Sequence, residues 1–232
     1  MLKTTNIESG YEGISIIRDM NIEIHKGEVV SIIGRNGVGK STFIKTLIGL
    51  NKAYDGNIVF DGADVTKLNS YDRAAKGLAY VPQGHGVFPQ LTVEENLKMG
   101  GLINSTMKKG NYNMVYEYFP RLAERKKQKA GTMSGGEQAM LSIGRVLIGN
   151  PKILLLDEPS EGVQPNIVSQ MGEIVGKIAK DLGLTVLLVE QHMGLIQQIS
   201  QRGYVMDKGS IIASLTREQI LDNALIKEYL TV

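Results

Sequence analysis

The chain has 232 residues and a formal net charge of +2, which is too small to indicate a nucleic-acid polyanion as its partner. This length suits one large α/β domain, or a domain with an inserted subdomain, and either has a sizeable core. The absence of cysteine excludes disulfides and cysteine chemistry, and no window approaches the roughly 18 apolar residues of a spanning helix, so we expect any membrane role to come through a partner.

The first part of the chain alternates apolar and polar residues, as half-exposed antiparallel strands do. We therefore expect a small antiparallel β layer, built from residues 2–9, 20–25 and 57–61. Near-continuous apolar, β-branched runs are typical of buried parallel strands. Such runs occupy residues 29–33, 78–81, 153–156 and 185–189, and segments with helical periodicity separate them. This order is the pattern of an α/β protein.

Helical patterns dominate the middle of the chain, for example at residues 111–119 and 138–147. We expect a helical subdomain, inserted at about residues 93–147, within a single domain that spans residues 1–232. Near the end of the chain, a turn at residues 207–210 separates two apolar runs and predicts a hairpin. A terminal helix is expected at about residues 217–229.

A complete G-x-x-x-x-G-K-S phosphate loop lies between the run at residues 29–33 and an amphipathic segment at residues 42–50. A strand, a loop and a helix start are the context that this motif requires. Free backbone N–H groups and the positive end of the helix would bind phosphates, and Lys40 would neutralise the β and γ phosphates while Ser41 ligates Mg²⁺. We assign nucleotide contacts to Gly34, Asn36, Gly37, Gly39, Lys40, Ser41 and Thr42.

The run at residues 153–156 ends in two adjacent carboxylates, Asp157 and Glu158. Ligands meet a parallel sheet at the C-terminal ends of its strands, so Asp157 is expected beside the phosphate loop as a Mg²⁺ ligand. Strand alternation points Glu158 elsewhere, toward the water that attacks the γ-phosphate, where it acts as general base or polariser. An acidic pair after a strand is usually a solvated strand end, but the phosphate loop favours the functional interpretation.

Residues 134–138 read Ser-Gly-Gly-Glu-Gln and precede a helix that we expect to begin near Glu137. Ser134 and Glu137 have the spacing of an N-cap and a capping-box glutamate, which is the favoured interpretation for this segment taken alone. A serine hydroxyl and glycine N–H groups at a helix N-terminus also form an anion site.

In their order along the chain, these motifs resemble those of the ATP-binding-cassette (ABC) ATPases, and the resemblance covers essentially the whole sequence. It implies a P-loop NTPase core with a mainly parallel sheet, a flanking antiparallel β layer and an inserted helical subdomain. Residues 134–138 match the family's signature segment, so the resemblance implies that Ser134, Gly135 and Gly136 bind ATP.

Three further positions follow from the same resemblance. Gln83 corresponds to the glutamine that senses Mg²⁺ and the membrane partner, and Tyr11 to the aromatic residue that stacks on adenine. Residues 160–162 lie where the family has its dimer-contact loop, although their sequence departs from the usual pattern.

The chain differs from the family at the switch position after the run at residues 185–189. That residue is usually histidine, whereas the register places Gln191 there and His192 one place later. An amide can hydrogen-bond the γ-phosphate but cannot relay a proton near neutral pH, so catalysis would depend more heavily on Glu158. His192 takes the role if the loop is shifted by one residue.

Within the family, the phosphate loop and the segments at residues 80–84, 87–97 and 188–191 together resemble importers of branched-chain amino acids and urea. The branched-chain members often carry Glu where this chain has Gln83, and the Arg-Asn-Gly-Val loop is similar to the urea type, which we favour slightly. This inference is by association, because no residue of such an ATPase normally touches the solute.

The resemblance implies the ATPase subunit of an importer, peripheral on the cytoplasmic face of the cell membrane, with ATP and Mg²⁺ as cofactors. Two copies, or this chain and a close relative, would enclose two ATPs, with Ser134 and Gly136 of one subunit facing the γ-phosphate at Lys40 of the other. Closure would drive a membrane-embedded permease that an external solute-binding protein supplies.

Two alternatives remain open at this point. A soluble ABC ATPase that acts on DNA or ribosomes usually carries long coiled-coil insertions or two cassettes, and this chain has neither heptads nor a second motif set. A P-loop kinase or GTPase would lack the signature segment, and a GTPase would need a guanine-reading loop that we do not find.

Overall fold

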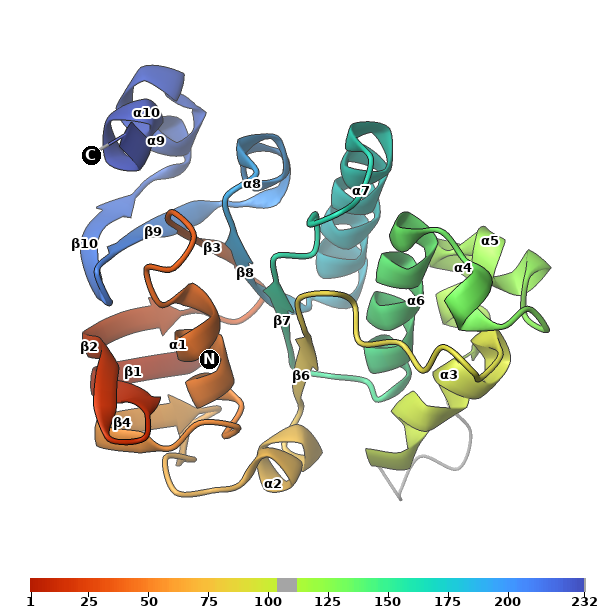
Figure 1. Cartoon of the computed structure of the whole chain (residues 1–232), viewed down its shortest axis with the longest axis horizontal. Coiled ribbons are helices and arrows are strands. Elements are labelled where there is room, and N and C mark those ends of the chain that lie inside the picture. The colour runs from red at the N-terminus through yellow and green to blue at the C-terminus, as the bar shows by residue number, and fades with distance from the viewer. Residues whose placement is uncertain (104–111, 232) are drawn as a thin grey trace.

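A computed structural model describes residues 1–103 and 112–231 (Figure 1). Within these residues the strands form a four-stranded sheet, in the order β2-β1-β4-β5, and a six-stranded sheet, in the order β10-β9-β3-β8-β7-β6. The strands are β1 (Leu2–Tyr11), β2 (Ile14–Ile24), β3 (Val29–Ile33), β4 (Ala53–Phe60), β5 (Ala63–Asp64), β6 (Leu78–Val81), β7 (Ile153–Asp157), β8 (Thr185–Glu190), β9 (Arg202–Asp207) and β10 (Ser210–Leu215).

The helices of the described residues connect and cover these strands. They are α1 (Lys40–Leu47), α2 (Ser70–Ala75), α3 (Val93–Gly100), α4 (Tyr112–Tyr118), α5 (Pro120–Glu124), α6 (Gly135–Ile148), α7 (Pro165–Leu182), α8 (Met193–Ile199), α9 (Arg217–Leu221) and α10 (Asn223–Thr231), with short 3₁₀ turns at Gly101–Ile103 and Ala130–Thr132. None of the helices in this part of the chain is long and apolar enough to cross a membrane.

The larger sheet is parallel from β9 to β6, and β10 pairs antiparallel with β9 at its edge. All residues of β3, β7 and β8 are buried because both faces of the sheet are covered. Along β3, Val30 and Ile32 pack into one hydrophobic cluster, whereas Val29 and Ile33 pack into the other. The four apolar runs are thus confirmed as strands of the parallel sheet, and of these only the edge strand β6 is partly exposed, at Ala79 and Tyr80.

The smaller sheet is antiparallel, since β1 pairs with both β2 and β4, and the expected β layer is confirmed. Helix α1 packs between the two sheets through Phe43, Ile44 and Leu47. The buried guanidinium of Arg73 donates hydrogen bonds to the carbonyl oxygens of Thr46 and Leu47 at 2.7 and 2.8 Å. This contact holds the C-terminal end of α1, and the position of α1 determines that of the phosphate loop.

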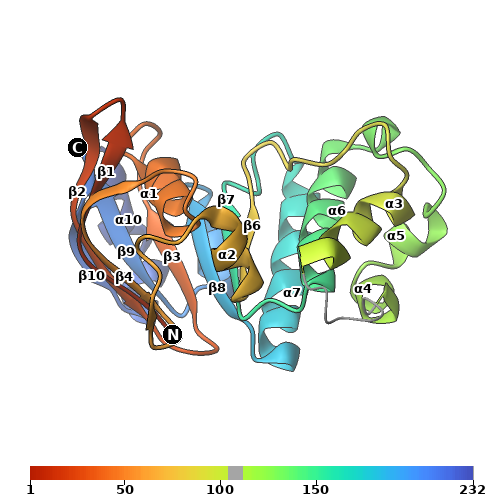
Figure 2. The same cartoon turned by 90° about the horizontal axis from the view of Figure 1, so that it is seen from below.

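Helices α3 to α6 lie on the far side of β6 from the antiparallel sheet (Figures 1 and 2). Helix α6 contacts α3 and β6, and thereby joins this helical region to the parallel sheet. The boundaries of a subdomain at about residues 93–147 stay a prediction. Residue 111, where the expected helix 111–119 begins, lies outside the described residues, and α4 itself starts at Tyr112.

Three expected helix boundaries were wrong. Helix α1 covers Lys40–Leu47 rather than residues 42–50, because the chain turns at Gly49, whose φ of 78° is left-handed. Helix α6 begins at Gly135 rather than near Glu137, because Ser134 caps it. The single terminal helix is two short helices, because Asp222 ends α9 and its carboxylate accepts hydrogen bonds from the Ala224 and Leu225 amides of α10.

Candidate nucleotide-binding site

The phosphate loop connects the end of β3 to the start of α1, as its motif requires. Gly37 and Gly39 have left-handed φ values of 82° and 109°, which glycine adopts at little cost. The buried Lys40 ammonium lies 2.9 Å from the carbonyl oxygens of both Gly34 and Arg35 and 3.0 Å from Glu158 Oε1. The loop therefore folds around a cation that three oxygens already contact.

A second contact joins the start of α1 to the end of β7. Ser41 Oγ donates a hydrogen bond of 2.9 Å to Asp157 Oδ1, and the Tyr80 hydroxyl donates one of 3.1 Å to Asp157 Oδ2. Burial raises the pKa of Asp157, while these two hydrogen bonds oppose the rise. Burial and the neighbouring Asp157 raise the pKa of Tyr80, which therefore stays a donor.

Glu158 does not follow the strand alternation that we expected. Strand β7 ends at Asp157, and Glu158 has a left-handed φ of 46° with its amide bonded to the Val189 carbonyl at 2.9 Å. Its carboxylate turns to the same end of the sheet as Asp157, where Oε1 meets Lys40 and Oε2 accepts a hydrogen bond of 3.3 Å from Gln83 Nε2. Gln83, Lys40 and Glu158 thus form one connected group.

The donor set at this edge suits a magnesium ion that also binds phosphate. In the described residues there is no group of three or more His, Cys, Asp or Glu side chains that could hold a metal unaided. Mg²⁺ typically uses one or two carboxylates together with substrate phosphates and water. Asp157 and the Ser41 hydroxyl provide hard oxygen ligands of this kind, 2.9 Å apart.

Tyr11 ends β1 and is 46% exposed. The nearby side chain of Asn51 is the main cause that lowers the pKa of Tyr11, and the side chain of Thr42 in α1 also lowers it. The ring therefore lies close to the first turn of α1 with much of its surface open to solvent, which is compatible with the expected stacking on a base.

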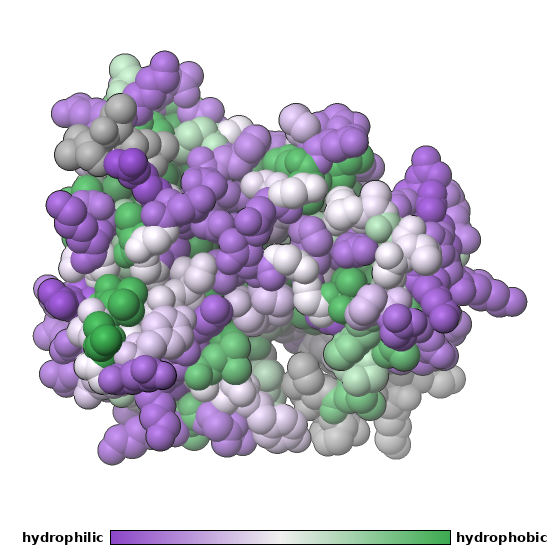
Figure 3. Space-filling view, in the orientation of Figure 1, coloured by the Kyte–Doolittle hydropathy of each residue, from purple (hydrophilic) through white to green (hydrophobic). Residues whose placement is uncertain are grey.

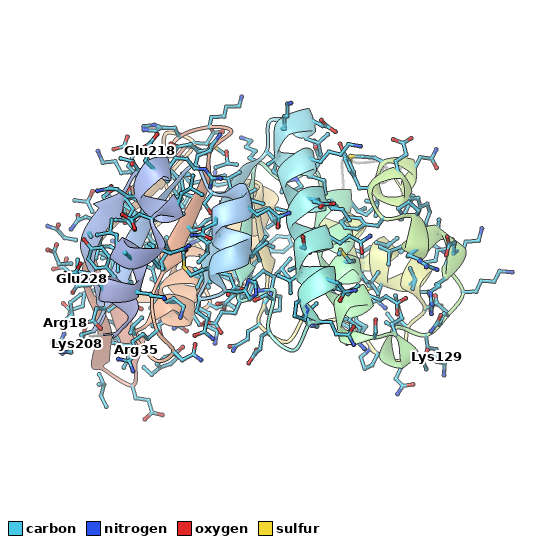
Figure 4. The ribbon with its side chains drawn as sticks, turned by 90° about the horizontal axis from the view of Figure 1, so that it is seen from above. Arg18, Arg35, Lys129, Lys208, Glu218 and Glu228 are labelled. Carbon is cyan, nitrogen blue, oxygen red and sulfur yellow. The ribbon has the colours of Figure 1, made fainter. Side chains whose placement is uncertain are left out.

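Basic side chains lie at the same end of the molecule as the phosphate loop. Arg35 belongs to that loop, Arg18 comes from β2 and Lys208 from the turn between β9 and β10 (Figure 4). All three are exposed and point outward, whereas Lys129 lies at the opposite end.

The segment 134–138 forms the capping box that its sequence allows. Ser134 Oγ accepts from the Glu137 amide, and Glu137 Oε2 accepts from the Ser134 amide at 3.0 Å. Arg125 Nε holds the other Glu137 oxygen at 3.1 Å. A Cβ at Gly136 would lie 2.4 Å from Ile167 Cγ2, so the close approach of α7 explains glycine at this position.

The capping box and the phosphate loop are not brought together within one chain. Helices α1 and α6 lie on opposite sides of β6 and β7 (Figures 1 and 2). Gly135 instead approaches the loop after β7, where its Cβ would lie 3.3 Å from the Gly162 carbonyl oxygen. Any shared role of Ser134 and Lys40 requires a second subunit.

Strand β8 ends at Glu190, and both candidate switch residues follow it with exposed side chains. His192 Nδ1 accepts a hydrogen bond of 3.2 Å from the Leu195 amide and caps α8. The side chain of His192 is thus bound to the start of a helix. Gln191 follows the strand directly, and its side chain does not cap a helix.

Sequence reasoning missed two residues at this edge. Tyr80 bonds to Asp157, and Glu190 accepts hydrogen bonds from the loop that follows Asp157. An acidic residue at the end of a buried strand was a usable signal for Glu190, since it is the same signal that identified Asp157. No local pattern singles out Tyr80, because its role depends on the pairing of β6 with β7.

A family model described as ABC transporter matches residues 17–161. The chain is 43% identical, over 98% of both sequences, to the high-affinity branched-chain amino acid transport ATP-binding protein BraG of Pseudomonas aeruginosa. It is 34% identical to the probable branched-chain amino acid transport ATP-binding protein LivF of Archaeoglobus fulgidus, over 96% of this chain and 95% of the relative.

More distant relatives and solved structures agree with this result. The chain is 31% identical to the lipopolysaccharide export system ATP-binding protein LptB of Haemophilus influenzae, over 98% of this chain and 95% of the relative. A crystal structure of the ADP conformation of an ATP-binding cassette of an ABC transporter matches with a TM-score of 0.85 and 28% identity, over 99% of this chain and 98% of the other.

Proposed function

The chain belongs to the ABC transporter family and is an ATPase, and from this premise we propose that it energises an importer of branched-chain amino acids. The observation that carries the catalytic part is the convergence of Lys40, Ser41, Asp157 and Glu158 at one end of the parallel sheet, with contacts of 2.9 and 3.0 Å. Each of these groups meets a different need of phosphoryl transfer to water.

The choice of solute rests on the relatives. Two of them are named for branched-chain amino acid transport, at 43% and 34% identity, whereas the lipopolysaccharide export relative is 31% identical. These names favour a branched-chain amino acid over urea, although the sequence of the phosphate loop is similar to the urea type. The solute remains an inference by association.

In the proposed reaction, Lys40 and the loop amides bind the β and γ phosphates of ATP. Ser41, Asp157 and Gln83 would hold Mg²⁺, which would supply positive charge to the phosphates. Glu158 orients a water and accepts its proton as the water oxygen bonds to the γ-phosphorus and the bond to ADP breaks. Gln191 donates a hydrogen bond to the γ-phosphate, and Tyr11 stacks on the adenine.

The signature segment completes the site in a dimer. Ser134, Gly135 and Gly136 stand at the N-terminus of α6, where the hydroxyl and the helix dipole favour an anion. We assign them to the γ-phosphate bound by the opposite subunit, which is either a second copy or a close relative. The separation of α1 from α6 in one chain supports this assignment.

A membrane permease is the proposed partner, and an apolar groove supports this role. The groove runs between α2, β6 and α6, and apolar residues gather on this face near α2 and β6 (Figure 3). Leu50 and Tyr71 line it with 58% and 67% of their surfaces exposed. Docking there would place the chain peripherally on the cytoplasmic face of the membrane, with the solute-binding protein outside. The alternative of a soluble ATPase acting on DNA or ribosomes lacks such support.

The test is uptake in cells that lack the chromosomal gene, measured separately with radiolabelled leucine and urea. The wild-type chain should restore leucine uptake, whereas Lys40→Ala should not, because it loses the phosphate-binding cation. The purified Lys40→Ala protein should hydrolyse ATP about 10²- to 10³-fold more slowly. Lys180→Ala, an exposed lysine in the last turn of α7, is the matched control. Urea uptake alone, or uptake that survives Lys40→Ala, would overturn the proposal.

A further inference from the structure

Glu190 is a buried carboxylate, 1% exposed, that has no part in the reaction described above. Its Oε1 accepts hydrogen bonds from both the amide, at 3.1 Å, and the hydroxyl of Ser160. Its Oε2 accepts from the amides of Gln191 and His192 at 2.7 and 3.0 Å. Hydrogen bonds to a charged acceptor are among the strong ones, and an unpaired carboxylate would be costly to bury here.

These contacts join two loops that come from neighbouring strands. Ser160 lies in the loop after β7, close behind Asp157 and Glu158, whereas Gln191 begins the loop after β8. The hydrogen bond from the Glu158 amide to the Val189 carbonyl, 2.9 Å long, joins the same two segments nearby. A carboxylate is rigid, so a displacement of Ser160 is passed on to the amides on its other oxygen.

The loop after β7 also faces the signature segment. The Gly162 carbonyl lies beside Gly135, and Ser160 receives a hydrogen bond from the Val163 amide at 3.1 Å, which gives this loop a defined turn. Residues 160–162 lie where the family has its dimer-contact loop, so we assign this loop to the contact with the opposite subunit in the proposed dimer. A displacement of this loop at the subunit interface can therefore reach Gln191 through a few covalent and hydrogen bonds.

We propose that Glu190 is a positioning residue that links the loop at residues 158–163 to Gln191, so that the approach of the opposite subunit sets the switch amide against the γ-phosphate. This inference rests on the proposed function, because it uses the role of Gln191 in hydrolysis. In this proposal, contact between the subunits displaces Ser160, and Glu190 transmits the displacement to the amide of Gln191.

The first test measures kcat and KM for ATP in Ser160→Ala, Ser160→Thr and Glu190→Gln. Ser160→Ala removes one donor to Glu190 and should lower kcat about tenfold, with KM changed less than about threefold. Ser160→Thr keeps the hydroxyl and should recover most of the rate. In Glu190→Gln, the new NH₂ group is a hydrogen-bond donor that faces other donors. This variant should therefore lower kcat further than Ser160→Ala does. A loss of kcat that threonine does not rescue, or a loss confined to KM, overturns the proposal.

The second test does not need ATP and remains informative if a variant is inactive. Amide hydrogen exchange at Gln191 and His192 should rise about fivefold in Ser160→Ala and stay near the wild-type rate in Ser160→Thr. Ser169→Ala, an exposed serine on α7, is the matched control. Unchanged exchange at both amides overturns the link, and raised exchange with an unchanged kcat overturns its role in positioning. A wild-type chain that hydrolyses no ATP, alone or with its permease, contradicts the proposed function and leaves the exchange result to decide the link.

Discussion

The two residues after β8 differ in what their side chains already do. His192 Nδ1 accepts from the Leu195 amide and caps α8, so its imidazole is tied to a helix start. Gln191 is exposed directly after the last residue of the strand. A capping side chain must give up its hydrogen bond before it can reach a phosphate, and this cost favours Gln191 as the switch.

We predict that Gln191→Ala lowers ATP turnover at saturating MgATP by about 10²- to 10³-fold, the usual loss when a well-aligned transition-state donor is removed. His192→Ala should keep most of the turnover and lose about 1 kcal/mol of stability as a helix cap is removed. Steady-state ATPase assays and thermal unfolding of both variants test this. The reverse result, an inactive His192→Ala, would move the switch by one residue.

Ionisation of Asp157 costs folding stability, because burial raises its pKa above the ordinary value of 3.8. A carboxyl whose pKa is higher in the folded state destabilises the fold once it is ionised. Unfolding free energy therefore falls as pH rises from 3.8 through the raised pKa, and the full cost is present above that pKa.

The prediction is that Asp157→Asn raises the melting temperature of the ATP-free protein near neutral pH. Each kcal/mol gained corresponds to about 2–4 °C in a domain of this size. The gain should disappear as the pH approaches 3.8, where the wild-type carboxyl is protonated. Hydrolysis in Mg²⁺ should be lost at the same time, because the proposed magnesium ligand is removed. Calorimetric scans at several pH values show whether the variant melts at a higher temperature than the wild type near neutral pH. A higher melting temperature at acidic pH alone would contradict the prediction.

Ser134 both caps the start of helix α6 and has a proposed role in binding ATP. Ser134 caps the helix, with Glu137 as the reciprocal partner, and Thr216 with Gln219 forms the same capping box on α9. The two caps are chemically alike, but only the first lies in the signature segment. Helix stability and ATP hydrolysis can therefore be separated by comparing them.

Ser134→Ala and Thr216→Ala should each cost about 0.5–2 kcal/mol in stability. Only Ser134→Ala should also lower ATP turnover, by about tenfold or more, because in the proposed dimer the Ser134 hydroxyl faces the γ-phosphate bound by the opposite subunit. Chemical denaturation and ATPase assays on both proteins give the comparison. Equal turnover in the two variants would leave Ser134 as a helix cap only.

At the scale of the whole molecule, the two proposed halves of the nucleotide site lie apart. The phosphate loop, Asp157 and Glu158 form one half, and the start of α6 forms the other on the far side of β6 and β7. Two chains in a head-to-tail arrangement would form two complete sites. In such a dimer ATP would bridge the two subunits, so its hydrolysis would open the dimer.

Glu158→Gln should bind MgATP, stall hydrolysis and accumulate as a dimer, because the amide cannot accept the proton of the attacking water. Size-exclusion chromatography with light scattering, with and without MgATP, measures this. Lys40→Ala combined with Glu158→Gln should stay monomeric, since it loses phosphate binding. A Glu158→Gln protein that stays monomeric with MgATP, both alone and beside a candidate partner ATPase, would contradict the shared site.

Much of the fold was predictable from the sequence because its signals are local. Strands β3 and β6 lie at the predicted residues, since strands of a covered parallel sheet are mostly apolar. The phosphate loop and Ser134 could be identified because their contacts are made by nearby backbone groups. The break at Asp222 was also local, but an aspartate inside a helical pattern does not by itself predict a new helix start.

The contacts within the site were decided by the tertiary structure. The left-handed φ of Glu158 turns its carboxylate to Lys40, which strand alternation does not predict. Tyr80 reaches Asp157, and Ser160 reaches Glu190, only because β6, β7 and β8 are neighbours in a particular register. The sequence by itself determined which groups are present and which strands are buried. The order and register of the strands decided which groups meet, because hydrogen bonds of about 3 Å depend on the packing of segments that are distant along the chain.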